Sequence, residues 1–139
     1  MTLSIRNQIP GTVTAVTPGE VMATVKVRLT GGQDITAAIT LESVEDLGLT
    51  AGTAVRALVK STEISLATAP VSGLSIRNQL PGTVTGLATG GAMASVKVAV
   101  QGAELTSVIT KDAAQDLGLA SGTSVVALIK ATEISLATA

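Results

Sequence analysis

The chain has 139 residues, with no Cys, His, Trp, Tyr or Phe among them. Without Cys and His it lacks a thiol nucleophile, a histidine base, a disulfide and the usual zinc or haem ligands, so we expect neither an enzyme nor a resident metal. It also has no aromatic rings for stacking, and its net charge of −1 is spread over both signs, so we expect no nucleic-acid partner.

The same sequence occurs twice in the chain. Residues 3–13 return as residues 74–84, and residues 57–66 return as residues 127–136. Between these segments the two copies align with a single deletion near Gly31. The shared positions include polar ones, which have no core to fill, so we infer that a duplicated polar constellation carries the function.

The first half of each copy is expected to form strands. In the first copy, residues 12–16 and 21–29 alternate between apolar and polar positions, residues 30–33 favour a hairpin turn, and residues 34–40 return as a strand. The strand over residues 21–29 is expected to place one set of apolar side chains on a single face: Val21, Ala23, Val25, Val27 and Leu29.

A short helix follows these strands. Leu41, Val44 and Leu47 have helical spacing, with Thr40 as the N-cap and Gly48 as the C-terminal stop. The chain then turns over residues 49–52 and is expected to form strands over residues 54–60 and 63–67. The second copy repeats these elements over residues 83–137.

We therefore expect an all-β protein made of two tandem domains. The boundaries are residues 1–69 for the first domain, 70–73 for a linker and 74–139 for the second domain. Five or so strands with one short helix, in a copy this short, predict a small closed barrel of the OB type, in which closure removes exposed strand edges. The extended leading segment, residues 3–9, could pair with its own copy, the other copy or another chain.

The chain is apolar for its size, with 46% hydrophobic residues. Each copy is so small that one core is marginal, and aliphatic side chains bury less area than aromatic ones, so we expect further burial between copies and between chains in an obligate oligomer. No apolar run approaches the length of a membrane span, and the N-terminus lacks an apolar signal core, so the sequence predicts a cytoplasmic protein without a membrane partner.

Three polar pieces recur in both copies, and all of them supply hydrogen-bond donors. Two are Ser-x-Arg-Asn at the start and Lys at a strand end; the third is Thr at the start of the short helix, where free backbone amides add donors. Such a set without a carboxylate suits a small oxyanion of charge −2. The residues are Ser4, Arg6, Asn7, Thr40 and Lys60 in the first copy and Ser75, Arg77, Asn78, Thr110 and Lys130 in the second.

Each piece also has a purely structural explanation. The threonines could be simple helix caps, the lysines solvated strand ends and the arginines members of surface ion pairs. Other positions have diverged between the copies, such as Arg28 against Ala99 and Arg56 against Val126. The retention of Ser-x-Arg-Asn against this background favours a shared function.

The order of the motifs resembles the molybdate-binding Mop domain, also called molbindin or TOBE. The motifs are Ser-x-Arg-Asn-Gln-x-x-Gly-Thr-Val, Ile-Thr-x-Glu-Ser, Leu-Gly-Leu-x-x-Gly and Val-Lys-Ser-Thr-Glu, and each copy resembles the domain from end to end. The resemblance implies OB-like barrels, binding of molybdate or tungstate, and compact assemblies of six domains. For a tandem chain that assembly is a homotrimer.

The resemblance also implies a set of oxyanion ligands in each copy. The Ser-x-Arg piece and the Thr/Lys piece would come from different domains that meet at an interface. Ala113 stands where the first copy has Ser43, so the second copy lacks that hydroxyl. The molybdenum would be held as the oxyanion, without a cofactor. The implied ligands are Ser4, Arg6, Thr40, Ser43, Lys60 and Ser61, and Ser75, Arg77, Thr110, Lys130 and Ala131, the last through its backbone amide.

In related proteins the tandem domains are joined to a helix-turn-helix regulator, and a similar domain ends the ATPase of the molybdate transporter. This sequence shows neither a DNA-reading helix nor a phosphate-binding loop, so we expect intracellular storage and homeostasis of the anion. The alternative is an OB-type structural or regulatory module that binds a protein partner, with Arg and Lys at intersubunit contacts.

Overall fold

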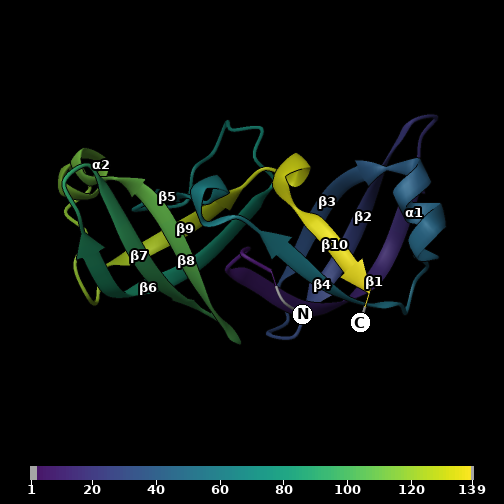
Figure 1. The fold of residues 1–139 in the computed structure, drawn as a ribbon, viewed down its shortest axis with the longest axis horizontal. Coiled ribbons are helices and arrows are strands. Elements are labelled where there is room, and N and C mark those ends of the chain that lie inside the picture. Colours follow the sequence, from purple (N-terminus) through teal and green to yellow (C-terminus); the bar gives the residue numbers. More distant parts are fainter. Residues whose placement is uncertain (1–2, 139) are drawn as a thin grey trace.

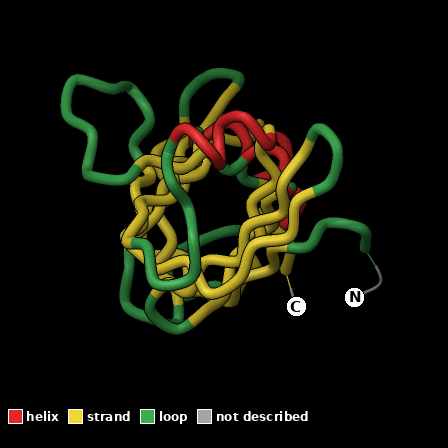
Figure 2. Tube along the Cα trace, turned by 90° about the vertical axis from the view of Figure 1, so that its left-hand side faces the viewer, coloured by secondary structure: helices red, strands yellow, loops and turns green. Residues whose placement is uncertain are grey.

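Residues 3–138, which the computed structural model describes, form two five-stranded antiparallel sheets, each curled into an OB-like half-barrel (Figure 1). Viewed from the end, the strands trace a rounded outline (Figure 2). The predicted all-β class, with one short α-helix per copy, is confirmed. The first copy has β1 (Asn7–Pro18), β2 (Met22–Leu29), β3 (Asp34–Thr40), α1 (Leu41–Leu47), β4 (Ala54–Val59), the 3-10 turn η1 (Ser61–Glu63) and β5 (Ser65–Ala67). The second has β6 (Asn78–Thr89), β7 (Met93–Val100), β8 (Ala103–Thr110), α2 (Lys111–Asp116), β9 (Ser124–Ile129), the 3-10 turn η2 (Ala131–Glu133) and β10 (Ser135–Thr138).

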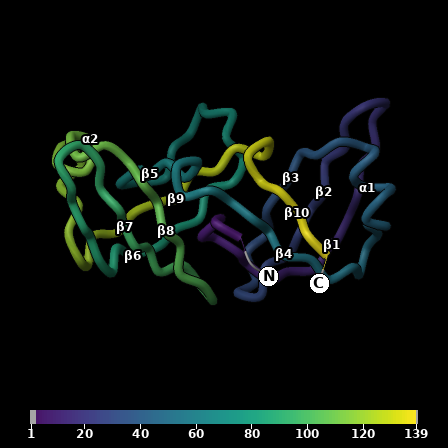
Figure 3. Tube along the Cα trace, viewed as in Figure 1, coloured from purple at the N-terminus to yellow at the C-terminus, as the bar shows by residue number. Residues whose placement is uncertain are grey.

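Each sheet takes one edge strand from the other copy. The strand orders are β10-β4-β1-β2-β3 and β5-β9-β6-β7-β8. Leu66 of β5 pairs with Ala127, and Leu136 of β10 pairs with Ala57. The yellow strand β10 therefore lies beside β4 of the first copy, and the trace in Figure 3 follows the crossing of both segments. Residues 70–73 separate the two sequence repeats along the chain, but each folded barrel contains residues from both repeats.

The alternating apolar residues of β2 form the expected buried face, but Val21, which was expected on the same face just before β2, is not buried. Ala23, Val25, Val27 and Leu29 are buried, whereas Val21 is 73% exposed. The β2–β3 ladder begins with Met22 opposite Thr40. The prediction for Val21 was wrong because this residue lies beyond the last pair of the ladder, where no facing strand covers it.

The helix and its caps form where the sequence predicts them. Helix α1 spans Leu41–Leu47, the hydroxyl of Thr40 accepts a hydrogen bond from the backbone N–H of Ser43, and Gly48 closes the helix at φ 63° in the left-handed region. Local hydrogen bonding decides all of these features, which is why the sequence alone reveals them.

The two ends of each copy differ from the expectation. Strand β4 stops at Val59, and the segment expected as one strand over residues 63–67 begins inside η1 and continues as β5. The backbone N–H of Glu63 donates to the carbonyl of Lys60 (2.9 Å), and this turn directs the chain to the other barrel. Of the leading segment, residues 7–9 pair with β4 of the same copy. Residues 3–6 are outside any strand and bend at Ser4.

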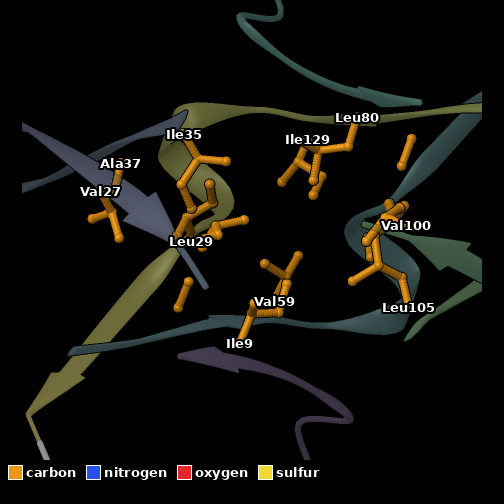
Figure 4. Close-up of a cluster of buried hydrophobic side chains, with 14 of the residues drawn as sticks. Ile9, Val27, Leu29, Ile35, Ala37, Val59, Leu80, Val100, Leu105 and Ile129 are labelled. Carbon is orange, nitrogen blue, oxygen red and sulfur yellow. The ribbon is translucent and has the colours of Figure 1, made fainter. Parts of the chain in front are cut away.

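One buried aliphatic cluster runs through both copies. It contains Ile9 and Val59 from the first copy together with Leu80, Val100 and Ile129 from the second (Figure 4). Because aliphatic side chains must fill this core without aromatic rings, the copies bury apolar area against each other. The two copies therefore share one buried core.

We expect that residues 1–69, expressed alone, fold only by association. In the full chain β5 pairs with the second copy, so an isolated first copy would have to exchange β5 with another molecule of itself. Sedimentation should give an even-numbered oligomer with native circular dichroism, while dilution should yield unfolded monomer. A folded monomer at micromolar concentration would contradict the role assigned to the strand exchange.

Candidate functional site

The predicted donors, unlike the two asparagines, lie mostly on the surface. Eight of them are exposed, and Ser43, Ser61 and Ala131 are half-buried. The exposed residues are Ser4, Arg6, Thr40, Lys60, Ser75, Arg77, Thr110 and Lys130.

The register between β1 and β4 brings the arginine and the lysine of one copy to the same end of a barrel. Asn7 is paired with Val59, so Arg6, which precedes Asn7, and Lys60, which follows Val59, continue from the last pair of the ladder. Asn78 and Ile129 form the equivalent pair in the second copy. The pairing of these strands therefore brings the chain positions of an arginine and a lysine to the same end of each sheet.

Two hollows lie at these strand ends. One of about 230 Å³ is lined by Ser75, Ile76, Lys130, Ala131 and Thr132. The lysine therefore shares a hollow with the Ser-x-Arg piece of its own copy, which differs from the expected grouping of lysine with threonine. The reason is the direct pairing of β6 with β9, whose ends carry these two pieces.

The hollow in the first copy is smaller and draws on both copies. It measures about 170 Å³, and its lining comes mainly from the leading segment and the two 3-10 turns. The residues are Ile5, Leu58, Lys60, Glu63, Thr132, Glu133 and Ser135.

Each arginine holds its own leading segment in a bend. Arg6 donates from Nη2 to the carbonyl of Leu3 (3.1 Å) and from Nε to the carbonyl of Ser4 (3.4 Å). Arg77 donates from Nη2 to the carbonyl of Leu74 (2.6 Å). A guanidinium has five N–H donors, so these contacts leave donors for a further acceptor.

The arginines at the strand ends have no carboxylate partner among the described residues. Within residues 3–138 the one ion pair joins Arg28 Nε to Asp34 Oδ1 at 2.8 Å, with both side chains more than half exposed. The hydrogen bond from Arg28 lowers the pKa of Asp34. The ion-pair explanation therefore fits Arg28 rather than Arg6 or Arg77.

Thr40 and Thr110 act as helix caps, so their structural explanation is confirmed. Thr40 Oγ1 accepts from the N–H of Ser43 (3.1 Å) and donates to Ser43 Oγ (2.7 Å). Thr110 Oγ1 accepts from the N–H of Ala113 (3.1 Å). The second copy thus presents one hydroxyl at this place and the first copy presents two.

The capping threonines lie far from the cationic strand ends. Helices α1 and α2 occupy opposite ends of the molecule, while η1 and η2 lie near its middle (Figure 1). Asn78 bonds to Thr36 at the junction of the barrels, and Thr40 lies about 13 Å farther along β3 at the usual strand rise. A single chain therefore keeps the threonines apart from the arginines and lysines.

The two asparagines have a role that the sequence interpretation missed. Asn7 and Asn78 are buried, at 2% and 3% exposure, and both amide hydrogens of each donate to main-chain carbonyls. Their side chains have no N–H left for an anion, so we leave them out of the ligand set proposed below. Asn7 lies two residues before Ile9, and Asn78 lies two residues before Leu80; both apolar residues are also buried. Because residues two apart on a strand share a face, this spacing was the sequence signal that the asparagines point inward.

Two duplicated contacts at the junction also escaped the sequence interpretation. Lys97 Nζ donates to Thr106 Oγ1 (2.8 Å), and Lys26 Nζ donates to Thr36 Oγ1 (3.2 Å). Both copies carry the same lysine and the same threonine at these positions, and this identity was the sequence signal for the contact. Ser61 differs from this pattern, because its Oγ is buried without a hydrogen-bond partner among the described residues, while the second copy has Ala131.

Residues 3–138 contain no cluster of three or more acidic, His or Cys side chains able to hold a metal ion. None of the helices within the same residues has the length and apolar character to cross a membrane.

Both copies match one family model, that of the TOBE domain. The matched segments are residues 3–66 and 74–136. These segments correspond to the two sequence repeats.

Several known proteins are similar to the whole chain. The molybdenum transport protein ModE of Azotobacter vinelandii is 40% identical over 138 residues, which cover 99% of this chain and 51% of ModE. The molybdenum-pterin-binding protein MopA of Rhodobacter capsulatus is 38% identical over 139 residues, which cover 99% of this chain and 52% of MopA. The chain therefore spans about half the length of the curated relatives it matches.

A solved structure matches both barrels. A molybdate-bound form of ModG, described as a cytoplasmic molybdate-binding protein, superposes with a TM-score of 0.96 at 44% identity, over 100% of both chains. The likeness therefore extends through the whole tandem arrangement.

Replacing Ser61 by Ala should leave the melting temperature of the anion-free protein unchanged or raise it. The substitution removes a buried hydroxyl without a partner, and such a group costs roughly 1–3 kcal/mol. Ser107→Ala is the matched control, because Ser107 Oγ donates to the carbonyl of Ile64 (2.6 Å) and its loss should lower the melting temperature. Equal losses in calorimetry would mean that the Ser61 hydroxyl does have a partner.

Proposed function

The chain belongs to the TOBE domain family, with one domain in each copy, and from this membership we propose that it binds molybdate for storage and homeostasis in the cytoplasm. Tungstate, a tetrahedral dianion of the same charge, is proposed as a second ligand. The role is binding of the intact oxyanion, without a chemical step, a cofactor or a separate metal. The molybdate-bound ModG structure and the molybdenum proteins among the relatives support this proposal.

The observation that carries the proposal is the cationic pair at the end of each barrel. Arg6 and Lys60 extend from the β1–β4 ladder, and Arg77 and Lys130 extend from the β6–β9 ladder. Each pair supplies two positive charges, which balance one dianion, and the neighbouring Ser hydroxyls supply neutral donors. No described carboxylate forms an ion pair with these side chains. The hollow at Lys130 has no acidic residue in its lining, whereas the hollow at Lys60 is also lined by Glu63 and Glu133.

We further propose that a complete site needs two chains. The cap hydroxyls of Thr40 and Ser43, and of Thr110 in the second copy, lie at the outer ends of the molecule, apart from the cationic pairs. A neighbouring chain that brings its helix start to a cationic pair would complete the donor set. The proposed ligands are Ser4, Arg6, Thr40, Ser43, Lys60 and Ser61, and Ser75, Arg77, Thr110, Lys130 and Ala131, the last through its backbone amide.

Exposed apolar side chains beside the helix start support such an assembly. Met22 lies opposite Thr40 in the β2–β3 ladder and is 45% exposed, and its neighbour Val21 is 73% exposed. In the second copy Met93, paired with Thr110, is 44% exposed. An interface here would bury these side chains while it brings the cap hydroxyls to a partner chain.

We expect a homotrimer, which contains six TOBE domains. Sedimentation velocity at micromolar concentration should give a mass close to three chains, with the trimer persisting on dilution. A folded, monodisperse monomer would contradict this assembly and leave the proposed sites incomplete.

The alternative function is an OB-type module that binds a protein partner through the same apolar surface. Isothermal calorimetry separates the two, since molybdate should bind with a saturating heat only if the chain is an anion carrier. Sulfate should compete poorly at equal concentration, because donors placed for a larger tetrahedral ion leave a smaller one with stretched bonds, each worth about 1–3 kcal/mol. Displacement of molybdate by equimolar sulfate would contradict this selectivity, and an absence of molybdate binding would favour the alternative.

The double variant Arg6→Ala/Arg77→Ala should weaken molybdate binding by roughly 2–4 kcal/mol, or about thirtyfold to nearly a thousandfold. It should remain folded and assembled, because the loss of one positive charge relieves repulsion in an empty cationic site. It should also lose most of the rise in melting temperature that molybdate gives the parent.

Arg28→Ala is the matched control for the double variant. It removes an exposed arginine outside the site, at a position where the second copy has Ala99, and its molybdate affinity should stay within about twofold of the parent. Dissociation of the double variant in the absence of anion would instead identify Arg6 and Arg77 as interface contacts and favour the protein-binding alternative.

A further inference from the structure

Asn7 and Asn78 make the same three hydrogen bonds, one within their own copy and two to the other copy. Asn7 Nδ2 donates to the carbonyl of Val59 in its own copy (3.0 Å) and to the carbonyl of Thr106 in the other copy (2.9 Å). Asn7 Oδ1 accepts from the N–H of Thr106 (2.7 Å). The side-chain amide is therefore fully used and joins three points of the backbone.

The second asparagine repeats this arrangement with the roles of the copies reversed. Asn78 Nδ2 donates to the carbonyl of Ile129 (3.0 Å) and to that of Thr36 (2.9 Å), and its Oδ1 accepts from the N–H of Thr36 (2.8 Å). Identical contacts in both copies show that this is a built feature of the junction.

From this geometry we propose that Asn7 and Asn78 are positioning residues, which fix the arginine and lysine of each copy relative to each other and to the opposite barrel. The inference rests on the proposed anion binding by these arginines and lysines. It assigns the asparagine side chains an indirect role, because neither has a side-chain N–H left to touch the anion.

The first step of the argument concerns the covalent neighbours of the bonded groups. Asn7 directly follows Arg6, and the carbonyl that it binds belongs to Val59, which directly precedes Lys60. One amide therefore ties together the two chain segments that carry the cationic side chains. In the second copy the amide of Asn78 does the same for Arg77 and Lys130.

The second step concerns the opposite barrel. Thr106 lies on β8 and Thr36 lies on β3, which are edge strands of their sheets. Each asparagine takes both the N–H and the C=O of its threonine, as a neighbouring strand would, and so covers part of an exposed edge. The cationic segment of one copy is thereby held against the sheet of the other copy.

The third step concerns the path of the chain. After Lys60 the backbone turns through η1 and crosses to the other barrel as β5, so the lysine stands where the chain leaves its own sheet. A crossing segment is free to shift unless something fixes its start. The asparagine supplies that fixation, and donors held in place before the anion arrives bind it more tightly than mobile ones.

The test uses the full chain and molybdate, with the single variant Asn7→Ala as the main measurement. Titration should become biphasic: the sites that contain Arg6 and Lys60 should weaken at least tenfold, while those with Arg77 and Lys130 keep the parent affinity. In stopped-flow measurements the change should lie in the dissociation rate, because the charges that attract the anion remain. Asn78→Ala should weaken the other set of sites.

Ser107→Ala is the matched control, because it also removes a buried hydrogen bond between the copies (2.6 Å to the carbonyl of Ile64) and Ala37 already occupies the equivalent position. It should lower the melting temperature and leave molybdate affinity within twofold of the parent. Uniform weakening of both sets of sites by Asn7→Ala, parent affinity in that variant, or an equal loss in Ser107→Ala would each overturn the positioning role.

A variant that does not fold is covered by Asn7→Ser, which keeps a neutral polar group at this buried position and lacks the two amide hydrogens. It should still weaken only the Arg6 sites, and parent affinity in this variant would overturn the proposal. If the parent chain itself does not bind molybdate, the proposed function fails, and this outcome is distinct from failure of the asparagine role.

Discussion

Strand β5 completes the sheet of the second copy and strand β10 completes that of the first, so neither copy closes its sheet with its own residues. The exchange compensates for the small apolar core that the amino-acid composition allows each copy. A small repeat without aromatic side chains buries little apolar area, so its stability alone is marginal. By sharing strands, the two copies join their cores into a single buried cluster, and the sheet of each copy is completed by the other.

The exchange also decides where the candidate site lies. Each chain segment leaves its barrel directly after Lys60 or Lys130, so the lysines stand at the junction of the barrels, beside the leading segment that carries the arginine. The short helices lie at the outer ends, and with them the cap hydroxyls. The donors are therefore divided between the middle and the ends of the molecule. This division is why we propose that a second chain completes each site.

The two copies keep the same architecture but differ in their donors. The first copy has Ser43 and Ser61, and the second has Ala113 and Ala131 at these places. The second copy has Ser107, which bonds across the junction where the first copy has Ala37. The copies thus differ in the hydroxyls of the candidate anion site and in one hydrogen bond at the interface between them.

The sequence by itself determined the elements that depend on neighbouring residues: the buried face of β2, the hairpin turn after Leu29, and helix α1 with its caps at Thr40 and Gly48. It also identified the duplicated donors. The tertiary structure decided the destination of β5 and β10, the grouping of lysine with the Ser-x-Arg piece, and the burial of Asn7. These features depend on contacts between distant segments, such as the hydrogen bond from Asn7 to Thr106, 99 positions away. Local propensity and alternation carry no information about which distant strand edge a segment will meet, because that choice is made by the packing of the whole chain.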